Sequence, residues 1–270
     1  MADIGLKMTD AEYRANPAIS RSELWRMRRS PEIFKYFKDY PEEPTEALLF
    51  GQVFHKYALE PETFNDEFIC EPDCDRRTKD GKAIYELFLQ DVGNRTIVPR
   101  KMMGEATLMG HLVTEHPLAA KLLKGEAEKV FFWTDKRTRI KCKCRTDMIR
   151  TTKDNIVVVD LKTCTDASTE AFTREAVKYG YDFQAAFYSE GVKENLGKYP
   201  KFVFIAIEKK PPYAINVMLA DDAFIDRGRQ ISAELLDAYK DCTKTKLWYG
   251  YNGPQNTINT LSLPSWMAAE

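Results

Sequence analysis

A short run of β-branched residues that ends in two charges constrains this chain most. Residues 156–159 are Ile-Val-Val-Val, and Asp160-Leu161-Lys162 follows directly. The aliphatic run predicts a buried strand, and because side chains alternate along a strand, Asp160 and Lys162 project from the same face. An ion buried without a partner is costly, and a buried strand has no structural use for either charge. The run therefore predicts both a central strand and a site at its end.

A second acid, Asp147, lies upstream of this strand. Carboxylates are the ligands that Mg²⁺ prefers, and a neighbouring lysine can hold a water or a phosphate oxygen while charge develops. The alternative is a structural salt bridge between Asp160 and Lys162, and the presence of Asp147 favours the metal site. In that interpretation Asp147 and Asp160 bind the ion and Lys162 orients the water. In many sites of this kind the carbonyl of the intervening residue, here Leu161, reaches the same ion.

Composition restricts the classes of protein. The 270 residues are 44% hydrophobic, which is enough for a substantial core, and we expect one domain over residues 1–270. No apolar stretch approaches the length of a membrane span, and the N-terminus lacks a signal-peptide core, so we expect a soluble, cytoplasmic protein without membrane contact. The six cysteines form no C-x-x-C pair and are expected to be reduced. A net charge of -1 confines any DNA contact to local patches.

The order of predicted elements indicates a mixed α/β fold. Residues 1–125 are predicted to be mainly helical, with a loop at 60–80, and 126–240 to hold strands with helices. The predicted strands are 129–134 and 139–149, joined as a hairpin, then 156–163, 201–208 and 213–219. The predicted helices include 21–29, preceded by a serine and closed by Ser30-Pro31, then 45–59, 81–92, 99–124, 168–195 with a break near Gly180, and 221–240. This order implies a central mixed sheet flanked by helices, with an N-terminal helical elaboration. In the tail, 241–270, we expect Thr260 to Trp266 to dock on the body or on a neighbouring subunit.

A basic row precedes Asp147. If residues 139–147 form one strand, its odd positions share a face, and they are Arg139, Lys141, Lys143, Arg145 and Asp147. The row would lead DNA phosphates toward the metal, or it would be an ordinary solvated face, which is the commoner explanation of such a row. A mixed case, in which Arg145 is buried by pairing and the outer residues meet DNA, is also open.

Further candidates lie on predicted helices. His55 is aligned with Gly51 on one helical face, although a lone helical histidine is more often a packing residue. Gln184 and Tyr188, four residues apart, could contact a phosphate backbone or pack on the sheet. Arg21 opens a basic helix that could bind a 5′ phosphate, contact another subunit or remain solvated.

Together these residues carry a family resemblance. Asp147, Asp160-Leu161-Lys162 and Gln184-x-x-x-Tyr188 resemble the PD-(D/E)XK nuclease superfamily, in its RecB-like branch. The closer resemblance is to the nuclease part of RecE-type exonuclease VIII from phage recombination systems. It runs through Ile19-Ser20-Arg21-Ser22-Glu23-Leu24, Gly51-Gln52-Val53-Phe54-His55, Leu59-Glu60-Pro61-Glu62-Thr63-Phe64, Cys144-Arg145-Thr146-Asp147, Phe183-Gln184-Ala185-Ala186-Phe187-Tyr188 and Thr260-Leu261-Ser262-Leu263-Pro264.

The resemblance implies roles and an activity. It makes His55, Asp147 and Asp160 metal ligands, Lys162 the catalytic lysine, and Gln184 and Tyr188 supports near the DNA. Glu128 matches an acid common in RecB-like relatives and ranks second. The implied fold is a restriction-endonuclease-like core spanning 126–240, with His55 supplied by the helical elaboration. The implied activity is a Mg²⁺-dependent 5′ to 3′ exonuclease on double-stranded DNA ends, which leaves 3′ overhangs; Mn²⁺ is expected to substitute. A ring of identical subunits, as a tetramer, a single-strand annealing partner and a phage or prophage origin in a bacterial cytoplasm are also implied.

Two other functions stay open. One is a Cas4-like or RecB-like nuclease on single strands, which often carries an iron-sulfur cluster. Such a cluster needs four thiolates grouped in space, and the spacing of these cysteines argues against it. The other is a catalytically silent DNA-binding ring module. The acids, lysine and histidine retained together argue against that alternative.

Overall fold

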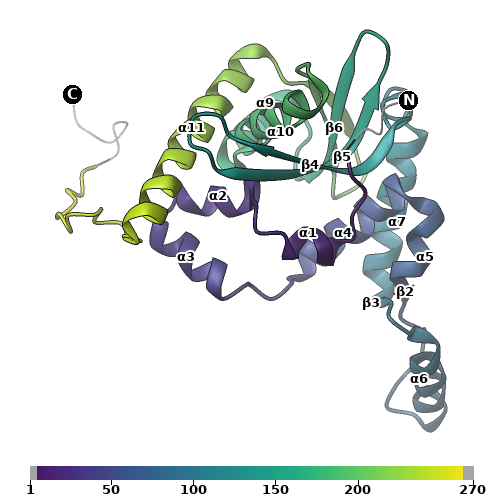
Figure 1. Ribbon diagram of the computed structural model, residues 1–270. Coiled ribbons are helices and arrows are strands. Elements are labelled where there is room, and N and C mark those ends of the chain that lie inside the picture. The colour runs from purple at the N-terminus through teal and green to yellow at the C-terminus, as the bar shows by residue number, and fades with distance from the viewer. Residues whose placement is uncertain (1–4, 264–270) are drawn as a thin grey trace.

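A mixed sheet organises the protein, which the computed structural model describes over residues 5–263 (Figure 1). The long central strands β5, β6 and β7 are joined by β8 at one edge, and β4 and the short β1 both pair with β5. The strands are β1 (Ile19–Ser20), β4 (Glu126–Thr134), β5 (Lys141–Thr151), β6 (Ile156–Cys164), β7 (Lys201–Glu208) and β8 (Ile215–Leu219). β4, β5 and β6 run antiparallel in turn, β6 and β7 are parallel, and β8 is antiparallel to β7. The predicted central mixed sheet is confirmed.

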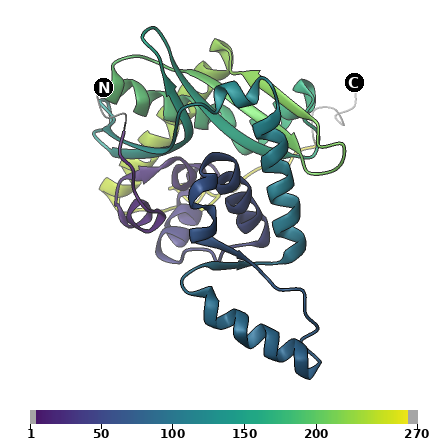
Figure 2. The ribbon, with the colours of Figure 1, turned by 90° about the vertical axis from the view of Figure 1, so that its right-hand side faces the viewer.

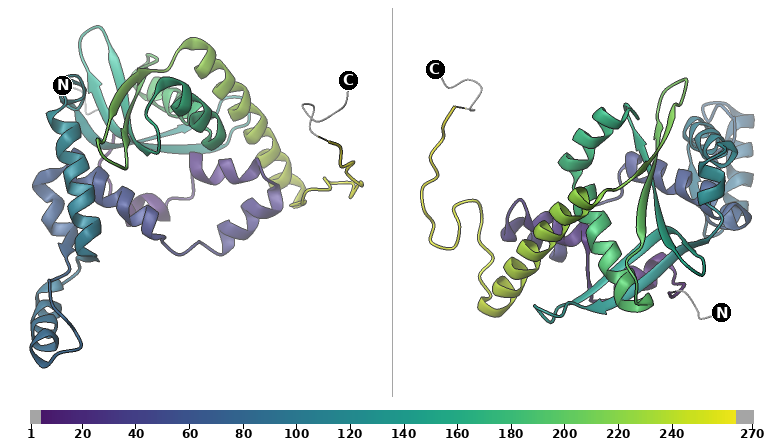
Figure 3. Two further views of the ribbon diagram at one scale, coloured as in Figure 1. Left: turned by 180° about the vertical axis from the view of Figure 1, so that it is seen from behind. Right: turned by 90° about the horizontal axis from the view of Figure 1, so that it is seen from above.

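Helices cover both faces of the sheet (Figures 1 and 3). One face is covered by α2 (Arg21–Met27), α9 (Thr169–Tyr179), α10 (Tyr181–Leu196) and α11 (Asp222–Thr245), and α3 (Pro31–Asp39) packs on α2 and α11. The other face packs against α4 (Glu46–Leu59), α7 (Arg100–Glu115) and α8 (Ala119–Leu122). Strand β6 shows the alternation: Val158 enters the first core, and Val159 and Leu161 enter the second. Asp160 therefore faces α10, on the side of Val158.

Side-chain caps set where the N-terminal helices begin. Thr9 and Ser20 each form a capping box, before α1 (Asp10–Ala15) and before α2. Ser30 caps α3, whose first residue is Pro31, so the predicted helix end at this proline is confirmed. The basic helix begins at Arg21, as predicted, and the preceding Ile19 and Ser20 form a short strand, not predicted from the sequence, that pairs in parallel with β5.

The second strand of the hairpin begins later than predicted. The hairpin itself is confirmed, with Val130 opposite Arg145 in the ladder. However, β5 begins at Lys141 and not at Arg139, which adopts a positive φ of 65° in the turn. Arg139 belongs to the turn and has no partner in the ladder, so it leaves the predicted basic row.

The expected loop at 60–80 was only partly right. It contains η1 (Pro61–Thr63), α5 (Phe64–Glu67) and β2 (Phe68–Cys70). β2 pairs in parallel with β3 (Thr96–Val98), and between these two strands α6 (Lys79–Val92) projects from the body as an arm (Figures 1 and 2). A three-residue strand whose partner lies beyond a helix leaves no local pattern, which is why the sequence did not reveal it.

The break between α9 and α10 was predicted correctly. Gly180 has a φ of 70°, and a Cβ there would lie 2.4 Å from the Trp25 ring. Glycine is therefore required both by the backbone conformation and by the contact. This break directs α10 across the sheet, which places Gln184 beneath Asp160.

The tail divides into two parts. Trp248 packs on the core beside Phe34, with ring centroids 5.4 Å apart. Further along, Leu261 is 99% exposed, so this stretch does not dock on its own body, and docking on a neighbouring subunit stays a prediction. Trp266 lies outside the described residues. Within residues 5–263, no helix combines the length and hydrophobicity of a membrane span.

Candidate active site

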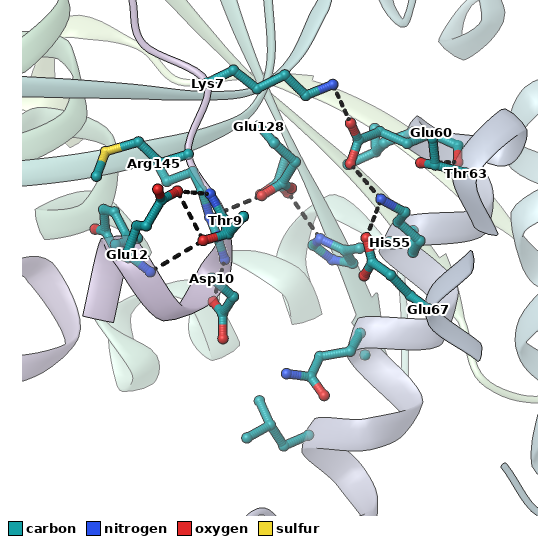
Figure 4. Close-up of a pocket in the computed structure, with 18 of the residues that line it drawn as sticks. Lys7, Thr9, Asp10, Glu12, His55, Glu60, Thr63, Glu67, Glu128 and Arg145 are labelled. Atoms are coloured by element: carbon teal, nitrogen blue, oxygen red, sulfur yellow. Dashed lines mark hydrogen bonds and ion pairs between the residues drawn. The ribbon is translucent and has the colours of Figure 1, made fainter. Parts of the chain in front are cut away.

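A cavity of about 1070 Å³ opens where α1, α4 and α5 meet the β4–β5 hairpin (Figure 4). It collects most of the predicted site residues, which come from five segments of the chain. Those lining it are Arg21, His55, Glu128, Arg145, Asp147, Gln184 and Tyr188. The structure therefore gathers the helical histidine, the hairpin acid and the α10 pair around one space.

Asp147 lies where β5 and β6 diverge. The ladder between these strands runs from Thr151–Ile156 to Met148–Val159 and stops there. Beyond it the Leu161 N–H donates to Asp147 Oδ2 over 2.8 Å, and His55 Nδ1 lies 3.5 Å from the same oxygen. The strand separation thus leaves room for a carboxylate between two sheet strands and a helix. Metal coordination by the Leu161 carbonyl stays a prediction.

Asp160 is buried behind this cavity. Its Oδ1 accepts a hydrogen bond from Gln184 Nε2, and its Oδ2 pairs with Lys162 Nζ. The pKa of Asp160 is raised to about 6, mainly by burial; the Lys162 charge opposes this rise and the nearby Asp147 charge adds to it. Lys162 Nζ also lies 4.9 Å from the Tyr181 ring centroid. Asp160 and Lys162 therefore form a salt bridge, and the same pair also belongs to a larger site that contains other acids.

Glu128 lies closer to the centre of the site than expected of a secondary candidate. It sits between ladder pairs Ala127–Met148 and Lys129–Thr146, directly across from Asp147, with a positive φ of 54°. Burial raises its pKa to about 8, and repulsion from Asp147 contributes. Arg145 Nε, 2.8 Å from Glu128 Oε2, is the compensating charge. A strained backbone that holds a second carboxyl beside Asp147 is typical of a functional position.

Tyr188 and Gln184 occupy one face of α10, as their spacing predicted. Gln184 is buried and bonded to Asp160. Burial raises the Tyr188 pKa well above its usual value, so the phenol stays protonated and can donate a hydrogen bond into the cavity. Gln184 thus contacts one of the acids directly, and a role of either residue near the DNA stays a prediction.

The basic row does not form a path to the acids. Lys143 is only 3% exposed, and its Nζ donates to the carbonyls of Tyr13 and Asn16 over 2.6 and 2.7 Å. Arg145 pairs with Glu128 and with Asp10, which it reaches over 3.1 Å. Lys143 was therefore wrong as a DNA contact, because the strand face it occupies is covered by the α1 segment.

The other basic candidates differ in whether they line the cavity. Arg139 and Lys141 are exposed on the hairpin, away from the cavity lining. Arg21 lines the cavity, but its guanidinium donates to the carbonyls of Tyr179 and Gly180 at the helix break. DNA contact by Arg21, Arg139 and Lys141 stays a prediction. Of the three, Arg21 lies beside the acids.

Sequence reasoning missed one charged group at the cavity rim. Lys56 pairs with Glu60 over 3.0 Å and with Glu67 over 2.5 Å, and Lys7 reaches Glu60 over 2.8 Å. Figure 4 shows Glu60 and Glu67 on one side of the cavity, with Lys7 extending toward Glu60. The sequence held one indication of this group: Glu60 lies in the Leu59-Glu60-Pro61 segment that carries part of the family resemblance.

The donor set suits a hard cation, although the side chains are not gathered around one. Across residues 5–263 no three His, Cys, Asp or Glu side chains converge as a metal-binding group. One Asp160 oxygen accepts a hydrogen bond from Gln184 and the other accepts one from Lys162. One Asp147 oxygen accepts a hydrogen bond from the Leu161 N–H. Yet Asp147 raises the pKa of both Asp160 and Glu128, so the cluster has an excess of negative charge that a divalent cation would relieve.

Replacing Lys143 by methionine tests its internal role. Methionine keeps most of the side-chain volume but leaves two carbonyl oxygens without their donor, so we expect the free energy of unfolding to fall by about 2 kcal/mol. Denaturant titration measures this, with Lys141→Met, on the exposed end of the same strand, as a control that changes stability by less than about 0.5 kcal/mol. Duplex affinity, measured by fluorescence anisotropy, should not change in Lys143→Met. Weaker binding with unchanged stability would contradict the assignment.

Comparison with known proteins agrees with this geometry. The family described as "PDDEXK-like domain of unknown function" matches residues 20–260. The crystal structure of a candidate exonuclease from Eubacterium rectale has a TM-score of 0.64 at 14% identity, over 98% of this chain and 100% of that chain, so the two share a fold. A second structure, SSO0001, has a TM-score of 0.30 at 20% identity, over 69% of this chain and 86% of that chain, which is too low to support an argument. No curated protein matches. The chain belongs to the family of PDDEXK-like domains.

Proposed function

We propose that this protein is a metal-dependent exonuclease that degrades double-stranded DNA from its ends in the 5′ to 3′ direction and leaves 3′ overhangs. One observation carries the nuclease assignment: Asp147 and Asp160 flank the divergence of β5 and β6, with Lys162 on Asp160 and His55 on Asp147. The family and the shared fold support nuclease chemistry. The direction, the duplex substrate and a role in phage-type recombination rest on the RecE-type resemblance of the sequence.

The residues divide the chemistry among them. His55, Asp147 and Asp160 would hold Mg²⁺, or Mn²⁺ in its place, with Glu128 in reach of the same space. A bound divalent ion lowers the pKa of its water and offsets charge on the phosphate. Lys162, paired with Asp160, would hold the attacking water or a phosphate oxygen as negative charge increases. Gln184 keeps Asp160 oriented, and Tyr188 can donate to a phosphate oxygen.

Linear duplexes labelled at either the 5′ or the 3′ end test the direction. With Mg²⁺ present, the 5′ label should appear at once as mononucleotide, while the 3′ label stays on long strands. A covalently closed circular duplex should remain intact, and chelation should stop the reaction. Early release of the 3′ label would reverse the direction. Cleavage of circles, or faster digestion of single strands, would favour the single-strand nuclease, and no digestion would favour the silent DNA-binding module.

Metal binding gives a second prediction that does not depend on catalysis. A cation that binds only the folded state at a hundred times its Kd adds about 2.7 kcal/mol of stability. We therefore expect Mn²⁺ to raise the unfolding temperature of the wild-type protein, measured by calorimetry, and this gain to disappear in Asp147→Ala and His55→Ala. His111→Ala, on the exposed side of α7, is the matched control and should keep it. An equal gain in all four proteins would place the ion elsewhere.

A further inference from the structure

Lys162 has a second contact besides Asp160. Its ammonium lies 4.9 Å from the centre of the Tyr181 ring, within the range in which an aromatic ring attracts a cation. The Lys162 side chain is only 17% exposed, and this attraction strengthens as a cation loses its water. The ladder places Ala206 beside Lys162 on β7, and a methyl group offers the ammonium no polar contact. Within residues 5–263, the partners of this cation are therefore the carboxylate and the ring.

Tyr181 lies on the face of α10 that already meets the site. Tyr181, Gln184 and Tyr188 are at positions i, i+3 and i+7, which share one face of a helix. Gln184 donates to Asp160, and Tyr188 lines the cavity. Tyr181 is the first residue of α10, directly after the break at Gly180. The three side chains therefore contact the lysine, the acid and the cavity in order along one helix.

Neighbouring rings fix the orientation of Tyr181. Its ring is stacked on Phe204 at an interplanar angle of 30°, with centroids 6.0 Å apart, and lies 5.9 Å from the Phe172 ring. Phe204 and Phe172 are both buried, so neither ring is free to move away. Tyr181 thus offers the cation a fixed, uncharged surface.

A ring and a carboxylate hold a lysine in different ways. A carboxylate accepts hydrogen bonds from the ammonium, whereas a ring attracts the charge and leaves the N–H donors available for water or a phosphate oxygen. In the proposed reaction Asp160 would also bind the divalent ion, which competes with Lys162 for the same carboxylate. A lysine side chain has large rotamer freedom and would then lose its position. The ring is the contact that does not depend on the carboxylate.

We infer that Tyr181 is a positioning residue, whose ring holds the Lys162 ammonium in place during hydrolysis; this role rests on the nuclease function proposed above. In this role Tyr181 does not touch the substrate and acts through Lys162. Because Lys162 acts on charge that develops in the transition state, loss of the ring should lower kcat and leave KM unchanged.

Steady-state digestion of a linear duplex tests the role. Tyr181→Leu should lower kcat about tenfold, and Tyr181→Phe, which keeps the ring, should retain the wild-type kcat. Tyr199→Leu removes an exposed ring 5.6 Å from Lys193 and is the matched control, with unchanged kcat. In a Lys162→Ala background, Tyr181→Leu should cause no further loss. An equal loss in both backgrounds, or no loss in Tyr181→Leu alone, would overturn the role.

A ring of reversed polarity separates attraction from packing. Pentafluorophenylalanine, introduced at position 181, keeps nearly the shape of phenylalanine but has the opposite quadrupole, so its face repels a cation. Its kcat should fall as far as that of Tyr181→Leu. If it retains the kcat of Tyr181→Phe, the ring acts only by filling space.

A measurement without substrate distinguishes this role from the nuclease function itself. An aromatic ring moves the ε-proton resonance of a lysine held over it upfield. In protein with ¹³Cε-labelled lysine, the Lys162 resonance, identified by its absence from Lys162→Arg, should lie upfield of an ordinary lysine. It should return to the ordinary position in Tyr181→Leu and stay shifted in Tyr181→Phe. An inactive wild-type protein with a shifted resonance would overturn the nuclease function, whereas an active protein with an ordinary resonance would overturn the role of Tyr181.

Discussion

Replacing Lys162 by alanine will lower the rate of mononucleotide release from a linear duplex by about a thousandfold, which corresponds to about 4 kcal/mol of transition-state stabilisation. Lys162 is the cation paired with the buried Asp160, on the strand face that meets α10. Its removal takes away the group placed to offset charge on the phosphate. Asp160→Asn should cause a loss at least as large, because the neutral amide is a weaker ligand for a divalent ion.

Controls separate a catalytic effect from a folding effect. Lys201→Ala removes an exposed lysine from the adjacent strand β7 and should leave the rate within about twofold of the wild type, as expected of a surface change. Circular dichroism and calorimetry establish that each variant is folded at the assay temperature. If folded Lys162→Ala and Asp160→Asn proteins release nucleotides at the wild-type rate, the pair is a structural salt bridge, and the active site lies elsewhere.

Replacing Gly228 by alanine will destabilise the fold by about 3 kcal/mol, at the upper end of the range for overpacked cores. Gly228 lies in α11 where this helix crosses α10. A Cβ at this position would stand 2.0 Å from the backbone oxygen of Asp182 and 2.8 Å from Ala186 Cβ. A backbone oxygen cannot rotate away as a side chain can, so α11 must shift. The shift would also disturb the Arg227 pair with Asp182, whose side chain is completely buried.

A second helical glycine provides the opposite result. Gly104 lies inside α7, is exposed, and has nothing within 4 Å of the position of an added Cβ. Gly104→Ala should raise the free energy of unfolding by about 0.5–1 kcal/mol, because alanine favours the helix. Denaturant titrations of both variants measure the two effects with identical chemistry. If Gly228→Ala is as stable as Gly104→Ala, the α10–α11 contact is looser than described.

Local signals predicted most elements of the fold and failed where pairing was distant. The start of α2 after Ser20, its end before Pro31, the hairpin and the break at Gly180 depend on neighbouring residues, and all were visible in sequence. The β2–β3 ladder was missed because its strands are three residues long and separated by α6. The start of β5 was misplaced because a positive φ at Arg139 is decided by the turn and not by alternation.

The candidate site shows the same division. Strand periodicity placed Asp160 and Lys162 on one face, and helix periodicity paired Gln184 with Tyr188. The central position of Glu128 was not visible, because it depends on the register of β4 against β5, which sets Glu128 across from Asp147. Lys143 was misassigned because alternation shows which face a residue occupies, but not that the α1 segment covers that face.

For this protein, the sequence by itself determined the apolar strand, the Asp160-x-Lys162 pair and the residue types needed for hydrolysis of a phosphodiester. These follow from side-chain alternation along a strand and from the chemical properties of each side chain, which do not depend on the fold. Only the tertiary structure decided that His55 lies 3.5 Å from Asp147, that Gln184 orients Asp160, and that Lys143 is internal. Such contacts join segments far apart in the chain, and the packing of α4 and α10 on opposite faces of a diverging sheet sets them.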